Sequence, residues 1–163
     1  MKRLHYALYF VGVVGVALFV PSLAQATGII PEPNANAVAL ATRANPEVLT
    51  LDARDVGRGL MTAIMLIPVQ PGPFTLVYPQ WIPGEHGPTG PLADISQLRV
   101  SANGKALAWH RDKVDMYAFH VEVPSGVSKL RVQFTVLVNS PTPMSTPNLA
   151  VVNWNRVLFY QNN

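Results

Sequence analysis

The feature that most constrains the fold is a stretch of fourteen residues, Tyr78 to Pro91, that contains four prolines and three glycines. Each proline fixes φ and removes a backbone N–H donor, so neither a helix nor a central strand can run through the stretch. An apolar strand is predicted before it, over residues 74–78, and an alternating strand after it, over residues 95–102. The stretch is therefore predicted to be a stiff loop between two strands.

The same loop carries the candidate functional side chains. Binding residues are often found on loops that a rigid scaffold positions, and this loop combines an aromatic anchor with two ionisable groups. Glu85 and His86 are adjacent and could supply a carboxylate and an imidazole to a ligand. The more common role of such a loop is structural, with Trp81 filling the edge of the core. The substrate-facing candidates are Trp81, Pro83, Gly84, Glu85 and His86.

Residues 1–26 have the three parts of a secretory signal peptide. Lys2 and Arg3 form a basic start, residues 7–20 are an uncharged apolar run, and Ala24-Gln25-Ala26 is an A-x-A cleavage site. The run is short for a bilayer span, which needs about 20 residues. The alternative is an uncleaved N-terminal anchor. We expect export to the periplasm or the extracellular space, with membrane contact only during export.

Composition excludes several classes of function. Cleavage after residue 26 would leave 137 residues (163 − 26) and lower the formal net charge from +3 to +1, which is too weakly basic for nucleic-acid binding. The chain has no cysteine, so disulfides, thiol chemistry and cysteine-ligated metals are excluded. Stability must come from an apolar core, and a chain of this length can form one.

The remaining sequence predicts an all-β protein. Residues 27–46 are rich in Ala, Asn and Pro and are predicted to be a flexible linker, and residues 47–163 form the β-domain. About eight strands with turn residues between them are typical of an antiparallel β-sandwich or a curved open sheet. The strand candidates are residues 48–53, 60–69, 74–78, 95–102, 105–110, 117–123, 130–138 and 149–160.

Individual segments differ in how strongly they specify their structure. Asn103-Gly104 accepts positive φ at both central positions of a type I′ turn and predicts a β-hairpin. Residues 117–123 and 130–138 alternate between apolar and polar side chains, as in strands with one buried face. Residues 60–69 are almost continuously apolar, which favours a strand buried on both faces over the alternative, a helix. Residues 141–147 are predicted to be another proline-rich loop.

No complete active site can be assembled from the sequence. His86, His110 and His120 lack the HExxH spacing of a zinc site, and there is no nucleophile motif. His110 and His120 are each predicted to be an ordinary surface or half-buried histidine, although they would be close in space if their strands pair. The sequence therefore predicts no catalytic residue, metal ligand or cofactor, and no enzyme activity in this chain as it stands.

Several motifs together resemble a known family. The loop Tyr78-Pro79-Gln80-Trp81-Ile82-Pro83-Gly84 is followed by Asp94-Ile95-Ser96, Asn103-Gly104-Lys105, Trp109, Asp115-Met116-Tyr117-Ala118-Phe119 and Asn153-Trp154-Asn155-Arg156-Val157-Leu158-Phe159-Tyr160. This arrangement resembles the N-terminal domain of the glycyl aminopeptidase family, which are zinc metallopeptidases that also carry a PDZ domain. The resemblance covers about residues 47–163. It departs from the family loop, which commonly continues P-G-x-Y, because His86 occupies that position.

The resemblance implies a non-catalytic β-domain that packs on a thermolysin-like catalytic domain and helps to form the wall of its substrate cleft. The partner would be that domain, or a peptide substrate bound through it. Zinc is expected only in the catalytic domain, because the HExxH helix and the downstream glutamate are not in this chain. We expect the sequence to be a fragment or a product cut short at its C-terminal end. The alternative is a self-contained periplasmic or secreted β-sandwich binding module.

Overall fold

The computed structural model describes residues 41–138, 146 and 148–162. The predicted signal peptide, residues 1–26, lies outside the described residues. So does the predicted linker up to residue 40, and so does the predicted loop 141–147 apart from Thr146. The described residues include most of the predicted β-domain.

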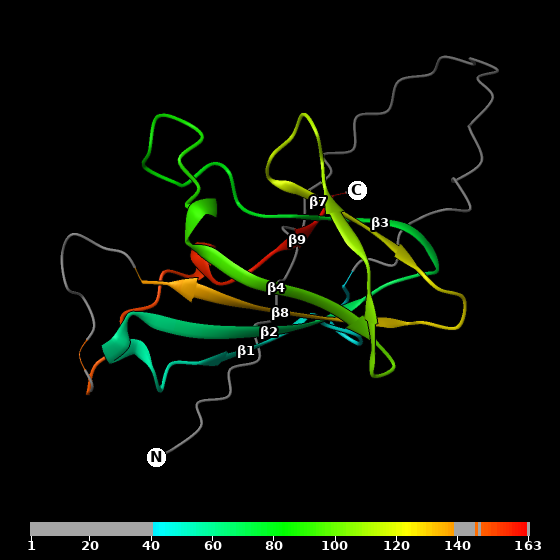
Figure 1. The fold of residues 1–163 in the computed structure, drawn as a ribbon, viewed down its shortest axis with the longest axis horizontal. Coiled ribbons are helices and arrows are strands. Elements are labelled where there is room, and N and C mark those ends of the chain that lie inside the picture. Colours follow the sequence, from blue (N-terminus) through cyan, green and yellow to red (C-terminus); the bar gives the residue numbers. More distant parts are fainter. Residues whose placement is uncertain (1–40, 139–145, 147, 163) are drawn as a thin grey trace, which may run out of the picture.

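The described chain is all-β, as predicted, and forms two antiparallel sheets (Figure 1). One sheet has the strand order β1-β2-β8-β4-β5, and the other has the order β6-β7-β3-β9. Of the two predicted architectures the sandwich is therefore correct, with one strand more than the eight expected. The strands are β1 (Val48–Asp52), β2 (Leu60–Pro68), β3 (Gly72–Val77), β4 (Ile95–Ala102), β5 (Lys105–Leu107), β6 (Trp109–Arg111), β7 (Ala118–Val123), β8 (Lys129–Leu137) and β9 (Tyr160–Gln161).

Helical structure in the described residues is limited to three short 3₁₀ helices: η1 (Val56–Arg58), η2 (Leu92–Asp94) and η3 (Trp154–Arg156). Across residues 41–138, 146 and 148–162, no helix has the length and apolar character needed to cross a membrane.

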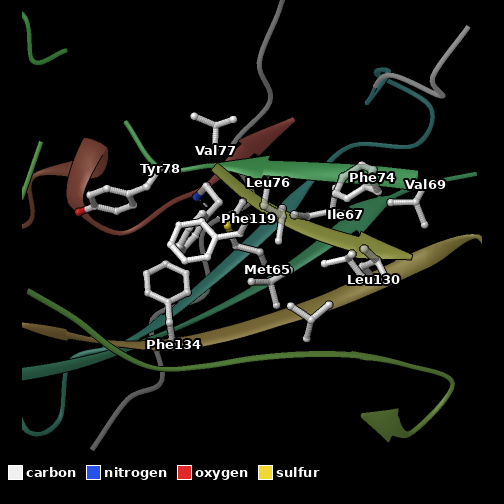
Figure 2. Packing of buried hydrophobic residues seen from close by; sticks show 14 of the residues in the cluster. Met65, Ile67, Val69, Phe74, Leu76, Val77, Tyr78, Phe119, Leu130 and Phe134 are labelled. Carbon is white, nitrogen blue, oxygen red and sulfur yellow. Dashed lines mark hydrogen bonds between the residues drawn. The ribbon is translucent and has the colours of Figure 1, made fainter. Parts of the chain in front are cut away.

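The core lies between the two sheets. β7 and β8 bury one face each, because alternate residues along each strand are apolar. Figure 2 shows Phe119 of β7 and Phe134 of β8 pointing toward each other across this layer. Phe159 is fully buried beside them, with its ring centroid 5.5 Å from that of Phe119 and 4.9 Å from that of Phe134. Aromatic rings from three parts of the chain therefore join the two sheets.

The Asn-Gly hairpin is confirmed, but its second strand divides between the two sheets. Asn103 and Gly104 both have positive φ, +48° and +77°, as a type I′ turn requires. β5 then pairs with β4 in the first sheet, whereas β6 pairs with β7 in the second. The break falls at Ala108, so a single extended segment closes one side of the sandwich.

The prediction that residues 60–69 are buried on both faces is wrong. Burial along β2 alternates: Ala63 and Ile67 are fully buried, whereas Leu66 remains 38 % exposed. The segment is a strand, as predicted. Its second face is apolar in composition, but no layer of the described structure covers it.

The predicted strand over residues 149–160 is also wrong. Only Tyr160 and Gln161 pair with another strand, β3. Before them, the N–H groups of Arg156 and Val157 donate to the carbonyls of Asn153 and Trp154, which closes the 3₁₀ turn η3. Local hydrogen bonds satisfy this backbone, and its apolar residues reach the core from a turn.

We predict that Phe159→Ala lowers the free energy of unfolding by about 3–5 kcal/mol, because it empties a buried aromatic site at the centre of the sandwich. Urea denaturation followed by tryptophan fluorescence measures the change. The control is Val114→Ala, which removes a side chain that is 95 % exposed and should change stability by less than about 0.5 kcal/mol. Equal effects of the two substitutions would contradict the assigned core.

Candidate functional site

Tyr78 connects the core to the candidate loop. It follows β3, is fully buried, and its N–H donates to the carbonyl of Tyr117 at 2.9 Å. Its hydroxyl donates to the carbonyl of Arg156 in η3 at 3.0 Å, and Figure 2 shows the hydroxyl at the outer end of the labelled core residues. Burial raises the pKa of Tyr78, so the hydroxyl remains a protonated donor at neutral pH. The start of the loop is therefore fixed to two other segments.

The proline loop, residues 79–91, is closed at its base by a very close backbone contact. The N–H of Gly90 donates to the carbonyl of Gln80 at 2.8 Å. A Cβ built on Gly90 would lie 1.9 Å from the carbonyl oxygen of Pro79, which no side chain can accommodate. Glycine at this position allows the outgoing limb of the loop to pack directly against the incoming limb.

Tyr117 joins the proline loop to a second loop. Its hydroxyl lies 3.1 Å from the carbonyl of Pro88 and 3.0 Å from that of Gly90, within donating distance of both. Tyr117 itself ends the β6–β7 loop, residues 112–117. The two loops project from the same side of the molecule in Figure 1 and form one unit.

The structure places the five predicted site residues on the exposed part of the proline loop. Trp81 is 64 % exposed, so the interpretation that it fills the edge of the core is wrong. Tyr78 supplies the aromatic group at that edge instead. Pro83, Gly84, Glu85 and His86 are also exposed.

Glu85 and His86 are not assembled into an acid–base pair. The carboxylate of Glu85 accepts a hydrogen bond from the hydroxyl of Thr89, and its N–H donates to the carbonyl of Ile82 at 3.0 Å. Within the described residues, no hydrogen bond joins Glu85 to His86. Glu85 thus shapes the loop, and His86 is presented to solvent.

A second polar cluster lies on the outer face of the β6-β7-β3-β9 sheet. His110 and His120 are cross-strand partners, as the sequence allowed, with ring centroids 5.1 Å apart. His120 lies between two partners: its Nε2 is 2.8 Å from Oδ2 of Asp112, and its Nδ1 is 3.0 Å from Oγ1 of Thr75. Sequence reasoning identified the two histidines but missed Asp112 and Thr75. The sequence did carry a signal for the pairing of the histidines: His110 and His120 lie at similar distances before and after the β6–β7 loop, so a hairpin places them opposite each other.

Asp112 organises the β6–β7 loop. Its Oδ1 accepts the N–H groups of Val114 and Asp115, both at 2.8 Å, while Oδ2 faces His120. These contacts hold the pKa of Asp112 well below its usual range; the hydrogen bond with His120 is the largest cause, followed by the two backbone N–H groups.

The cluster does not form a metal site. Both ring nitrogens of His120 already have hydrogen-bond partners. In the part of the chain that the structure describes, no group of three or more His, Cys, Asp or Glu side chains is placed to hold a metal ion. The arrangement suits a structural role: it fixes the loop that carries Val114 and Met116.

We predict that Gly90→Ala destabilises the domain and displaces the proline loop, because the added methyl group would overlap backbone that cannot move independently. Thermal unfolding and the amide chemical shifts of residues 79–91 measure the two effects. The matched control is Gly87→Ala, where the nearest atom to an added Cβ is the Thr89 methyl at 3.9 Å. Indistinguishable variants would show that the close approach is not required.

We predict that the stability of the wild-type protein falls as the pH drops below about 4, in part because of Asp112. The native pKa lies below the usual 3.8, so the unfolded chain binds the proton first and its population rises. Asp112→Asn should lower stability at neutral pH and flatten this acid-side slope. Urea melts from pH 2 to pH 7, about the range over which carboxylates titrate, measure it. Glu122→Gln, on the exposed face of β7, should keep the wild-type slope.

Comparison with known proteins agrees with the predicted resemblance. The family model described as Peptidase M61 N-terminal domain matches residues 48–163. No curated protein matches the chain. Among solved structures, an aminopeptidase N family protein from Idiomarina loihiensis is similar at 18 % sequence identity, with a TM-score of 0.49. The match covers 56 % of this chain and 15 % of that one.

The family match includes every strand of the β-domain, from β1 to β9. It also includes both loops of the candidate site. The predicted resemblance to the N-terminal domain of a peptidase family is confirmed. The chain belongs to the Peptidase M61 N-terminal domain family.

Proposed function

We propose that this chain is the non-catalytic N-terminal domain of an exported zinc aminopeptidase-like protein, and that it packs on a catalytic domain and shapes its substrate cleft. The observation that carries the proposal is the family match over residues 48–163, because an N-terminal domain of a peptidase works together with a catalytic one. The signal-peptide pattern of residues 1–26 supports export to the periplasm or beyond.

The proposed contact with the catalytic domain is a docking face formed by Trp81, Val114 and Met116. These side chains are 64 %, 95 % and 57 % exposed, and all three lie on the two joined loops. Large apolar side chains gathered on one exposed surface are typical of interaction sites, and Trp contributes strongly to binding energy when it is buried against a partner.

The rigidity of the loops supports the same role. Gly90 and Tyr117 fix the proline loop, and Asp112 fixes the β6–β7 loop. Side chains on preorganised loops lose less conformational entropy on association than those on flexible loops. A stiff docking face could therefore hold one wall of a cleft in a constant position.

Zinc belongs to the proposed partner. Both ring nitrogens of His120 are already hydrogen-bonded, and no group of three or more ligand side chains gathers here in the described chain, so these residues do not fit a zinc site. In the proposed assembly the thermolysin-like domain would hold the metal and supply the peptidase chemistry. The present chain would contact a peptide substrate only as it lies in the shared cleft.

The test is association between the full chain and a separately expressed thermolysin-like catalytic domain of a Peptidase M61 protein. Size-exclusion chromatography with light scattering should show an equimolar complex. Trp81→Lys and Met116→Lys should each weaken it, because they place a charge in an apolar contact. Leu66→Lys is the control: Leu66 is also exposed, at 38 %, but lies on β2 away from the two loops, and its substitution should have no effect.

Two results would contradict the proposal. A monomer with one sharp urea transition and no association with the catalytic domain would favour the self-contained binding module. Equal weakening by the Leu66 and Trp81 substitutions would show that the contact is not made through the docking face.

A further inference from the structure

A row of short polar side chains crosses the outer face of the five-stranded sheet. Asp52 of β1 is paired with Thr62 of β2, Thr62 with Thr135 of β8, and Thr135 with Ser96 of β4. Directly paired residues share a face of the sheet, and neighbouring strands lie about 4.8 Å apart. The four side chains therefore form one continuous row. It points away from the core, because Phe134, next to Thr135, is fully buried.

The row forms part of the lining of a polar hollow of about 240 Å³. Asp55 and Gln97 complete its polar lining, and Leu60 and Leu137 form an apolar edge. Pockets for drug-sized ligands are about 300–1,000 Å³, so this hollow has room for one smaller molecule.

Gln97 reaches the hollow because β4 is irregular there. The register between β4 and β8 shifts between Ser96 and Arg99, which marks a β-bulge. Gln97 has φ of +54°, an uncommon conformation for a residue with a side chain. Bulges re-aim side chains and are frequent next to binding sites. Here the bulge adds a carboxamide to the end of the polar row.

The chemistry of the lining indicates the class of ligand. In the described structure no hydrogen bond is made by the hydroxyls of Thr62, Ser96 or Thr135, and each can both donate and accept. Of the two carboxylates, Asp52 is paired with Arg54 and Asp55 lies 3.6 Å from Arg58, so the hollow carries little net charge.

We propose that this hollow binds a small neutral molecule with several hydroxyl groups, of the size of a monosaccharide. Ligand hydroxyls can satisfy donors and acceptors alike, and they can donate to carboxylates, which only accept. The apolar edge suits the C–H groups of a sugar ring. This proposal is independent of the docking face, whose residues Trp81, Val114 and Met116 do not line the hollow.

The test is titration of the full chain, labelled with ¹⁵N, by glucose, galactose, mannose and N-acetylglucosamine in separate experiments. At least one sugar should produce saturable amide shifts at residues 62, 96, 97 and 135. Thr135→Val keeps the shape of the side chain and removes one hydroxyl, so it should weaken binding about five- to tenfold.

The matched control is Thr50→Val on the same outer face of β1, outside the hollow, which should leave the affinity unchanged. Three results would overturn the proposal: the absence of saturable shifts with all four sugars, shifts centred elsewhere on the surface, or equal weakening by the two threonine substitutions. The amide spectra of the two variants also show whether each keeps the wild-type fold.

Discussion

The structure around the candidate site depends on donors that the proline loop itself does not have. Four of the fourteen residues from Tyr78 to Pro91 are prolines, so four backbone N–H groups that could bind carbonyls of the loop are missing. The hydroxyl of Tyr117 supplies a donor to Pro88 or Gly90, and the carbonyl of Tyr117 accepts from Tyr78. Tyr117, the last residue of the β6–β7 loop, thus fixes both the base of the proline loop and the end of β3.

This arrangement separates the stable part of the molecule from the part available for recognition. Tyr78, Tyr117 and Gly90 are buried and position the loops, whereas Trp81, Val114 and Met116 are exposed on them. The polar hollow lies elsewhere, on the five-stranded sheet. Two surfaces of different chemistry, one apolar and one rich in hydroxyls, can therefore contact different molecules without competing for the same residues.

Local sequence patterns were sufficient to predict much of the fold. The Asn103-Gly104 turn and the alternation in residues 117–123 and 130–138 depend on neighbouring residues alone, and the structure confirms them. The division of residues 105–111 between two sheets could not be predicted, because it depends on which distant strand each half meets. Residues 149–160 were misread because apolar side chains that reach the core from a turn have the composition of a strand.

The loop that carries the candidate residues was predicted from the sequence, but its contacts were not. A proline-rich segment with Trp81, Glu85 and His86 identified the loop from sequence. The Asp112–His120–Thr75 chain was missed because its members come from the β6–β7 loop, β7 and β3, and only the strand register brings them together. The sequence also did not show which aromatic side chain of the loop is buried. Trp81 and Tyr78 are three residues apart and both aromatic, but only Tyr78 is buried.

The pairing of β2 with β8 has a consequence for the order of events during synthesis. β2 lies between β1 and β8, and its register runs from Leu60 opposite Leu137 to Pro68 opposite Lys129. The centre of the first sheet therefore cannot close until the chain has been made as far as Leu137. Until then β2 has only β1 as a strand partner, so a nascent chain leaves one edge of this apolar segment unpaired from the time residue 69 is added until β8 follows.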